Sequence, residues 1–217
     1  MPDSCPMSGK DKKERPYQNI PTVPEEGELN LAELAGKNLE STEVEIGFGK
    51  GHFILDRARD NPQIAFLGLE VRRKWVDLVS SRAEKRELTN VCVQYGDARR
   101  VLPRIQQEAV VSRFFVNFPD PWWKARHVKR MVVTDAVVSE MGRLLRDGGE
   151  LFVQTDVDFR ARDYVELLSR QPFLEPDSGD RGVIEHNPFG ARSLREKKCE
   201  QIGLPIYRML FRRKARI

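Results

Sequence analysis

Three carboxylates stand where successive apolar segments of the sequence end. Glu45 precedes a glycine-rich turn, Glu70 ends a second apolar segment, and Asp97 follows a third. A carboxylate at the end of a second strand can accept hydrogen bonds from ribose hydroxyls, and Asp97 could accept one from an adenine amino group. Two of them have an ordinary alternative, since Glu70 could pair with a neighbouring arginine and Asp97 could cap the following helix. Together, beside one glycine loop, they indicate a nucleoside-binding site.

The glycine loop has the sequence EIGFGKG over residues 45–51, with glycines at Gly47, Gly49 and Gly51. Glycines permit a tight turn and let a ligand approach the backbone closely. Their G-x-G-x-G spacing differs from the G-x-G-x-x-G of dinucleotide-binding proteins, and Glu45 would repel a pyrophosphate but attract a cation. The pattern therefore favours a ligand with a ribose, an amino-bearing base and a positive charge. S-adenosylmethionine meets these requirements, and NAD meets them less well.

A basic and aromatic block, NFPDPWWKARHVKR, occupies residues 117–130. Two prolines flank Asp120 and fix the backbone that carries its carboxylate. Trp122 and Trp123 could stack on a base or cover the edge of the sheet. The basic side chains of the block are Lys124, Arg126, His127, Lys129 and Arg130. A basic run is usually a solvated helix face, but beside aromatic residues and a ligand site it is typical of a contact with a nucleic-acid backbone.

The segments that carry these residues alternate between short apolar runs and longer amphipathic ones. The apolar runs predict strands over residues 42–47, 65–70, 91–95, 113–118, 150–155 and 206–212. The amphipathic stretches predict helices over residues 51–59, 72–86, 98–108, 129–145 and 158–168. Strands that alternate with helices form a mostly parallel sheet, whose ligands bind beyond the carboxyl ends of the strands. The predicted fold class is therefore α/β, with the carboxylates and the basic block at one edge of the sheet.

The chain has 217 residues, of which 32% are charged, and a formal net charge of +4. This length suits one α/β domain, which we place at residues 27–217, after a flexible tail over residues 1–26 that is rich in Pro, Lys, Asp and Glu. Three widely spaced cysteines do not predict a disulfide framework or a zinc site. The sequence lacks a signal peptide and any apolar run near the ~20 residues of a membrane span. We expect a cytoplasmic protein that contacts no membrane and holds no metal.

Several of these segments resemble the bacterial tRNA (guanine-N7-)-methyltransferase family. They are EIGFGKG, GLE (68–70), GDAR (96–99), the block at 117–130, Thr155-Asp156 and the segment 193–196. The resemblance covers residues 40–213 and implies a Rossmann-like, doubly wound, mostly parallel sheet of the class I methyltransferase type. It also implies transfer of a methyl group from S-adenosylmethionine to N7 of the guanine at position 46 in the tRNA variable loop.

The resemblance further implies roles for individual residues. The methyl donor would meet Glu45, Glu70, Asp97 and Asp120, together with the loop glycines Gly47, Gly49 and Gly51. The substrate would meet Lys124, Asp156, Ser193, Leu194, Arg195 and Glu196, and the RNA would meet Arg126, His127, Val128, Lys129, Arg130 and Met131. Trp123, Met131 and Ser193 stand where the family commonly has proline, a further basic residue and threonine. These departures bear on RNA affinity more than on the reaction.

Guanine N7 has an in-plane lone pair and no proton, so its methylation needs alignment for in-line displacement rather than a strong base. Asp120 is the predicted catalytic residue, because a fixed carboxylate near the purine stabilises the positive charge that the purine gains; Asp156 would hold the guanine edge. We expect tRNA as the partner of a monomer or homodimer that needs no other protein. Three alternatives stay open: a methyltransferase for a protein or small molecule, an RNA-binding module with an inactive cofactor pocket, and a nicotinamide oxidoreductase.

Overall fold

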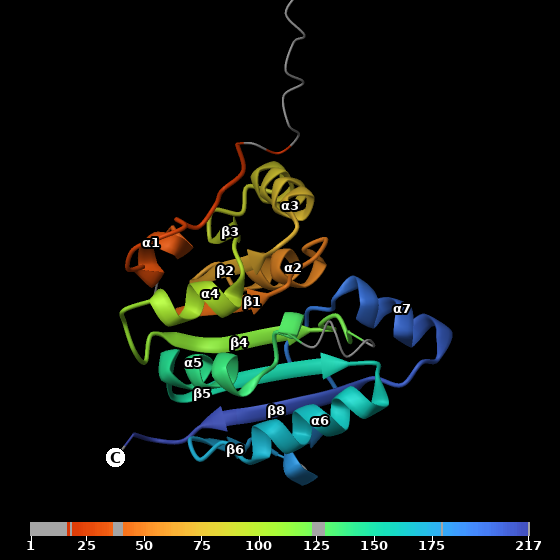
Figure 1. Ribbon diagram of the computed structural model, residues 1–217. Helices are drawn as coiled ribbons and strands as arrows, with labels where there is room; N and C mark the ends of the chain where they lie inside the picture. The colour runs from red at the N-terminus through yellow and green to blue at the C-terminus, as the bar shows by residue number, and fades with distance from the viewer. Residues whose placement is uncertain (1–16, 18, 37–40, 123–128, 179, 217) are drawn as a thin grey trace, which may run out of the picture.

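A mixed sheet forms the centre of the computed structural model, which describes residues 17, 19–36, 41–122, 129–178 and 180–216 (Figure 1). The strand order is β3-β2-β1-β4-β5-β8-β6, and β7 also pairs with β8. The parallel strands are β1 (Ser41–Ile46), β2 (Ile64–Glu70), β3 (Val91–Tyr95), β4 (Val111–Asn117) and β5 (Leu145–Thr155). Antiparallel pairing joins β8 (Tyr207–Arg213) to β5, β6 (Leu174–Pro176) and β7 (Val183–Ile184). The predicted α/β class with a mostly parallel sheet is confirmed.

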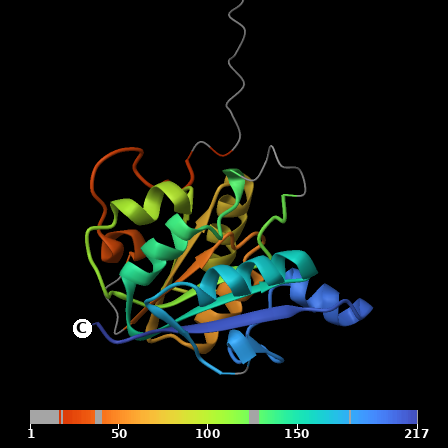
Figure 2. The ribbon, with the colours of Figure 1, turned by 60° about the horizontal axis from the view of Figure 1, so that its bottom comes forward.

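Helices cover both faces of this sheet (Figures 1 and 2). One face carries α1 (Leu31–Ala35), α4 (Ala98–Val101), α5 (Asp135–Leu144) and α6 (Asp158–Ser169). The other face carries α2 (His52–Asp60) and α3 (Arg73–Lys85), and α7 (Leu194–Ile202) lies near the far ends of β4 and β5. The 3₁₀ helices include η1 (Leu102–Arg104) and η3 (Asp180–Gly182). The sheet is therefore covered on both sides, as the doubly wound arrangement requires.

Strand β2 illustrates how the sequence pattern sets this packing. Leu67 and Leu69 join the core under α1, α4, α5 and α6, whereas Phe66 packs with Ile54 of α2 and Val79 of α3. Successive side chains of a strand point to opposite faces, and both faces here are covered. All seven residues of β2 are consequently buried, which explains a sequence that is apolar up to its last residue.

The largest differences from the predicted elements lie between residues 129 and 155. Helix α5 begins at Asp135, because the Thr134 hydroxyl caps it by accepting a hydrogen bond from the Val137 N–H. Strand β5 begins at Leu145, so Gly148, with φ +72°, lies within the strand and does not end the helix. The pairing of β4 with β5 is irregular in this region, and the six predicted residues of the strand cover only its regular part.

The helix predicted over residues 98–108 is also shorter than expected. Helix α4 ends at Val101, and the chain continues as η1 only to Arg104. Pro103 lies in η1 and lacks the N–H that a continuing α-helix would use.

An N-terminal arm, residues 20–29, runs along the edge of the sheet. Its Thr22 forms a parallel bridge with Tyr95 at the end of β3, and Arg104 donates hydrogen bonds to two of its carbonyl oxygens. Ile20 and Val23 are buried. Residues 20–26, assigned to the flexible tail from their composition, thus pack against the domain, because two apolar side chains and backbone pairing suffice to hold them there.

Gly68 of β2 gives a test of this packing. A Cβ at this position would lie 2.6 Å from the Phe48 ring, 2.9 Å from Val93 Cγ1 and 3.0 Å from Ile54 Cδ1, and overpacking of this kind costs about 1–3 kcal/mol. Gly68→Ala should lower the free energy of unfolding by that amount in denaturant titrations. The double variant Gly68→Ala/Val93→Ala should lose less than the sum of the single variants; strict additivity would contradict the clash.

Candidate functional site

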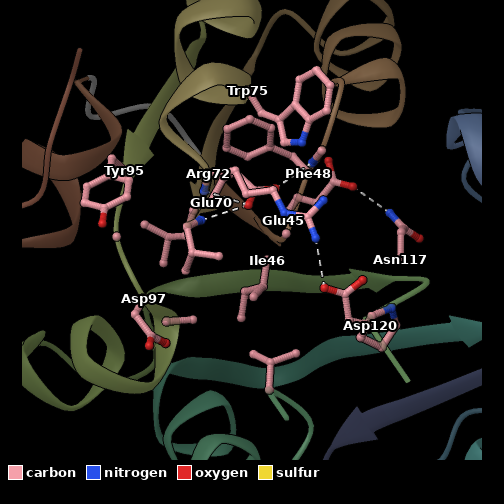
Figure 3. A pocket seen from close by; sticks show the side chains of 18 of the residues that line it. Glu45, Ile46, Phe48, Glu70, Arg72, Trp75, Tyr95, Asp97, Asn117 and Asp120 are labelled. Carbon is pink, nitrogen blue, oxygen red and sulfur yellow. Dashed lines mark hydrogen bonds and ion pairs between the residues drawn. The ribbon is translucent and has the colours of Figure 1, made fainter. Parts of the chain in front are cut away.

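A cavity of about 910 Å³ opens where β1, β2, β3 and β4 end (Figure 3). It is lined by every residue predicted to bind the methyl donor, namely Glu45, Gly47, Gly49, Gly51, Glu70, Asp97 and Asp120. It is also lined by four residues predicted to meet the substrate or the RNA, namely Arg130, Ser193, Leu194 and Arg195. The parallel topology therefore brings together residues that lie up to 150 positions apart in the sequence.

The glycine loop follows β1 with a backbone that L-residues adopt only with strain. The φ angles are +75° at Gly47, +53° at Gly49 and +74° at Gly51. A Cβ would meet no atom within 4 Å at Gly47 or Gly49, but at Gly51 it would lie 2.5 Å from Val79 of α3. Gly47 and Gly49 are thus required by their backbone conformation, and the space beside them is open. Gly51 instead lets α2 approach α3.

Glu70, at the end of β2, holds this loop. Its Oε2 accepts a hydrogen bond from the Gly49 N–H at 3.0 Å, and its Oε1 accepts from the Val71 and Arg72 N–H groups at 2.9 and 3.0 Å. Burial nevertheless raises the pKa of this carboxyl above its ordinary value. Glu70 therefore fixes the glycine loop and presents an acceptor to the cavity at the same time.

Glu45 is the most deeply buried carboxyl of the cavity. Its Oε1 accepts a hydrogen bond from Asn117 Nδ2 at 2.8 Å, while its Oε2 is buried without a hydrogen bond to the described residues (Figure 3). Removal from water raises the pKa of Glu45 to about 8. An acceptor that is buried and unsatisfied in this way suits a cationic ligand that brings its own charge.

Asp97 both caps a helix and lines the cavity. It caps α4 by accepting a hydrogen bond from the Arg99 N–H at 3.0 Å, and it forms an ion pair with the Arg99 side chain. Burial raises its pKa, but the hydrogen bonds from Arg99 outweigh burial and hold the pKa below its ordinary value. The capping reading is therefore correct, and the same carboxylate lines the cavity.

Asp120 lies on the opposite side of the cavity from Asp97 (Figure 3). Its Oδ2 is 3.1 Å from Arg72 Nη2, and both side chains are 54% exposed. The fourth strand end is thus tied to the second across the mouth of the cavity. Nothing in the sequence marks Arg72 as a site residue beyond its place close to Glu70.

The segment 193–196 divides into a surface part and a buried part. Ser193 caps α7, since its hydroxyl accepts a hydrogen bond from the Glu196 N–H at 3.1 Å. Arg195 forms an ion pair with Asp156, which itself does not line the cavity. Glu196 is fully buried and bonds to Gln154, Asn187 and Arg208. Its carboxylate therefore faces the protein interior, not the cavity.

The basic block is described only in part. Lys124, Arg126, His127 and Val128, like Trp123, lie outside the described residues. Arg130 lines the cavity, with its guanidinium 5.2 Å from the centroid of the Trp122 ring. Lys129 is exposed, whereas Met131 packs partly buried against the core.

The cavity has lining residues that the motifs did not indicate. Trp75 of α3, Tyr95 at the end of β3 and Lys198 of α7 contribute to its walls, as do residues 22–25 of the N-terminal arm. No sequence motif marks them, because they reach the site through the packing of α3, α7 and the arm. Within the described ranges, no group of three or more His, Cys, Asp or Glu side chains is arranged to hold a metal ion. The helices of the same ranges include none long and apolar enough to cross a membrane.

Solved structures with a similar fold include several methyltransferases. An S-adenosylmethionine-dependent O-methyltransferase from Thermotoga maritima aligns with a TM-score of 0.56 and 17% identity, covering 86% of this chain and 64% of that one. The 16S rRNA methyltransferase KamB aligns with a TM-score of 0.57 and 15% identity, covering 90% and 100%. These likenesses confirm the predicted class I methyltransferase fold.

Relatives found by sequence are more similar to this chain than these solved structures are. A family model described as a putative methyltransferase matches residues 40–209. The tRNA (guanine-N(7)-)-methyltransferase of Synechococcus sp. (strain JA-3-3Ab) is 36% identical over 172 residues, which are 79% of this chain and 72% of that protein. Its counterpart in Myxococcus xanthus (strain DK1622) is 34% identical over 166 residues, or 76% and 80%. The chain therefore belongs to the tRNA (guanine-N7-)-methyltransferase family.

Proposed function

We propose that this protein transfers the methyl group of S-adenosylmethionine to N7 of a guanine in tRNA, at position 46 of the variable loop. Family membership supports the reaction and the substrate class. The observation that carries the proposal is the set of strand-end carboxylates around one cavity, with Glu45 Oε2 buried and unbonded in the part of the chain that the structure describes. This acceptor set fits a nucleoside that bears a positive charge and no phosphate.

The residues fit the methyl donor along the length of the cavity. When bound, S-adenosylmethionine supplies a methyl group activated by its positively charged sulfur. Glu45 would accept the cationic amino-acid end, the loop at Gly47 and Gly49 would let that end approach the backbone, and Glu70 and Asp97 would accept hydrogen bonds from the nucleoside. Open space above Gly47 and Gly49 supports this placement.

Asp120 and Arg72 would act at the reacting end. The methylated purine gains positive charge, so a carboxylate held nearby stabilises the transition state. The 3.1 Å ion pair with Arg72 fixes Asp120 at the cavity mouth. Asp156, joined to Arg195, would hold the guanine edge from the side of α7. No residue is required to remove a proton, since N7 carries none.

The tRNA backbone would meet the basic rim of the cavity. Arg130, in the segment before α5, and Arg195, on α7, both line the cavity and are exposed. Lys129 is exposed beside Arg130. Cations in this arrangement neutralise phosphates and position the RNA without reading its sequence. Lys124, Arg126, His127 and Val128, outside the described residues, complete the RNA-contacting segment that we propose.

A direct assay tests the proposed function. Unmodified tRNA is incubated with the protein and S-adenosylmethionine carrying a labelled methyl group, and the methylated nucleoside is identified and mapped. We expect 7-methylguanosine at position 46, and no label in a tRNA whose guanine 46 is replaced by adenine. Label in protein or in small molecules but not in tRNA would refute the proposal.

The buried position of Glu45 predicts a pH-dependent stability. Its pKa rises from 4.5 to about 8 on folding, so the folded protein retains a proton that the unfolded chain releases. Stability is therefore lost as pH rises through this window, by about 1.4 kcal/mol per pH unit. Glu45→Gln, which cannot ionise, should exceed the wild type in free energy of unfolding by a margin that grows from pH 4.5 to about 8 and then levels. A margin independent of pH would show that Glu45 titrates normally.

Asp120 should matter for turnover more than for binding. Replacing it with Asn removes the charge and keeps the volume, so we expect turnover to fall on the order of tenfold or more, with tRNA affinity changed less than about threefold. Asp147→Asn is the matched control, because Asp147 is an exposed carboxylate paired with Arg216 elsewhere on the surface. Near-normal turnover of Asp120→Asn would leave positioning as its only role.

Arg130 should contribute a salt-dependent term to tRNA binding. If its guanidinium contacts a phosphate, Arg130→Ala flattens the slope of log affinity against log salt by about one. Donor affinity should stay unchanged. Arg59→Ala serves as control, since Arg59 is exposed and paired with Asp60 at the end of α2. A wild-type slope for Arg130→Ala would identify its surface as merely solvated.

A further inference from the structure

A row of buried polar side chains crosses the sheet beside the cavity. Asn117 of β4 and Gln154 of β5 are register partners, and Gln154 is in turn the partner of Arg208 on β8. These three residues lie two positions from Phe115, Phe152 and Leu210, which pair in the same way and form an apolar row. Because the side-chain period of a strand is two, both rows occupy the same face.

Hydrogen bonds link the polar row into one chain. Asn117 Nδ2 donates to Glu45 Oε1 at 2.8 Å (Figure 3), and Gln154 Nε2 donates to Asn117 Oδ1 at 2.8 Å. The same Nε2 donates to Glu196 Oε2 at 3.0 Å, and Arg208 Nη2 lies 3.1 Å from Glu196 Oε1. The chain therefore runs from the donor cavity at Glu45 to the first turn of α7 at Glu196.

The two ends of this hydrogen-bonded chain belong to different halves of the site. Glu45 lines the cavity among the donor residues, whereas Glu196 anchors the turn of α7 whose Ser193, Leu194 and Arg195 line the cavity from the other side. Asn117 also lines the cavity, but Gln154 does not, and it is completely buried. An effect of Gln154 on either substrate must consequently pass through its neighbours.

The hydrogen-bonded side chains are polar at positions where packing alone would favour apolar groups. Gln154 Oε1, Glu45 Oε2 and Arg208 Nε are all buried without a hydrogen bond to the described residues. Buried polar atoms left in this state destabilise a fold, so the row adds less to stability than an apolar row of the same shape would. What the row provides is a defined geometry. Each hydrogen-bond donor and acceptor has few possible partners, so the bonds fix the relative position of the strands and α7.

We propose that Asn117 and Gln154 are positioning residues, which hold the substrate-facing start of α7 in register with the donor site through the chain from Glu45 to Glu196. This inference rests on the proposed function, since it assigns the two ends to donor and tRNA. It reassigns Glu196 from a substrate contact to the anchor of α7. Arg195, which is paired with Asp156 of the turn between β5 and α6, then reaches the guanine from a helix whose position the donor pocket helps to set.

Gln154→Met tests the proposal, because Met keeps the volume and removes the middle link. We expect kcat/KM for tRNA to fall about tenfold, while the affinity for S-adenosylhomocysteine changes less than about threefold, since no cavity group is altered. Asn90→Leu is the matched control. Asn90 is equally buried and donates to three backbone carbonyls away from the cavity, so this variant should lose stability but keep kcat/KM within about twofold.

Two results would overturn the proposal: a folded Gln154→Met enzyme with kcat/KM for tRNA within twofold of the wild type, or an equal loss in Asn90→Leu. If Gln154→Met does not fold, Gln154→Asn replaces it, because the shorter amide breaks the chain but remains polar, and the same expectations apply. If the wild type binds S-adenosylhomocysteine and methylates tRNA, but Gln154→Met has no effect on kcat/KM, this inference alone is refuted. Absence of tRNA methylation by the wild type refutes the proposed function instead.

Discussion

The burial of Glu45 at the end of β1 is the constraint on which the site depends. β1 lies between β2 and β4, and Glu45 is in register with Gly68 on one side and Phe115 on the other. Glu45 is only 3% exposed, so its charge is poorly hydrated and is stable only if neighbouring groups or a ligand supply a partner. Asn117 supplies one hydrogen bond, and the remaining oxygen is left for a cation.

The glycine loop at the same edge of the sheet must be held in place before a ligand binds. Three glycines at alternate positions, each with a positive φ angle in the fold, make this segment flexible in the unfolded chain. A flexible loop would bind a ligand weakly, because ordering it opposes binding. Glu70 removes much of this disadvantage by bonding to the Gly49 N–H before a ligand arrives. The residue that we propose for the ribose thus also preorganises the neighbouring glycine loop.

The sequence was sufficient for the parts of this design that depend on local pattern. Alternation of strands and helices predicts the sheet, and the rule that ligands bind at carboxyl ends of strands brings Glu45, Glu70 and Asp97 together. The polar chain could not be predicted, because Asn117 and Gln154 become neighbours only through the pairing of β4 with β5. The resemblance assigns Glu196 to the substrate from a local motif, but hydrogen bonds from Gln154, Asn187 and Arg208 turn its side chain into the interior.

The site separates its charges by depth, and this separation bears on how two unlike ligands share one cavity. The carboxyls Glu45 and Glu70 are buried, whereas Arg130, Arg195 and Lys198 are exposed at the rim. Charges at the exposed rim act through water and are weakened by salt, but those in the interior are screened far less. A small cation therefore gains most by entering fully, and a polyanion too large to enter gains most by staying at the rim. Under the proposed function, the donor's methyl group lies between the two regions, where Asp120 and Arg72 join across the mouth, and the reaction takes place at the boundary between the acidic interior and the basic rim.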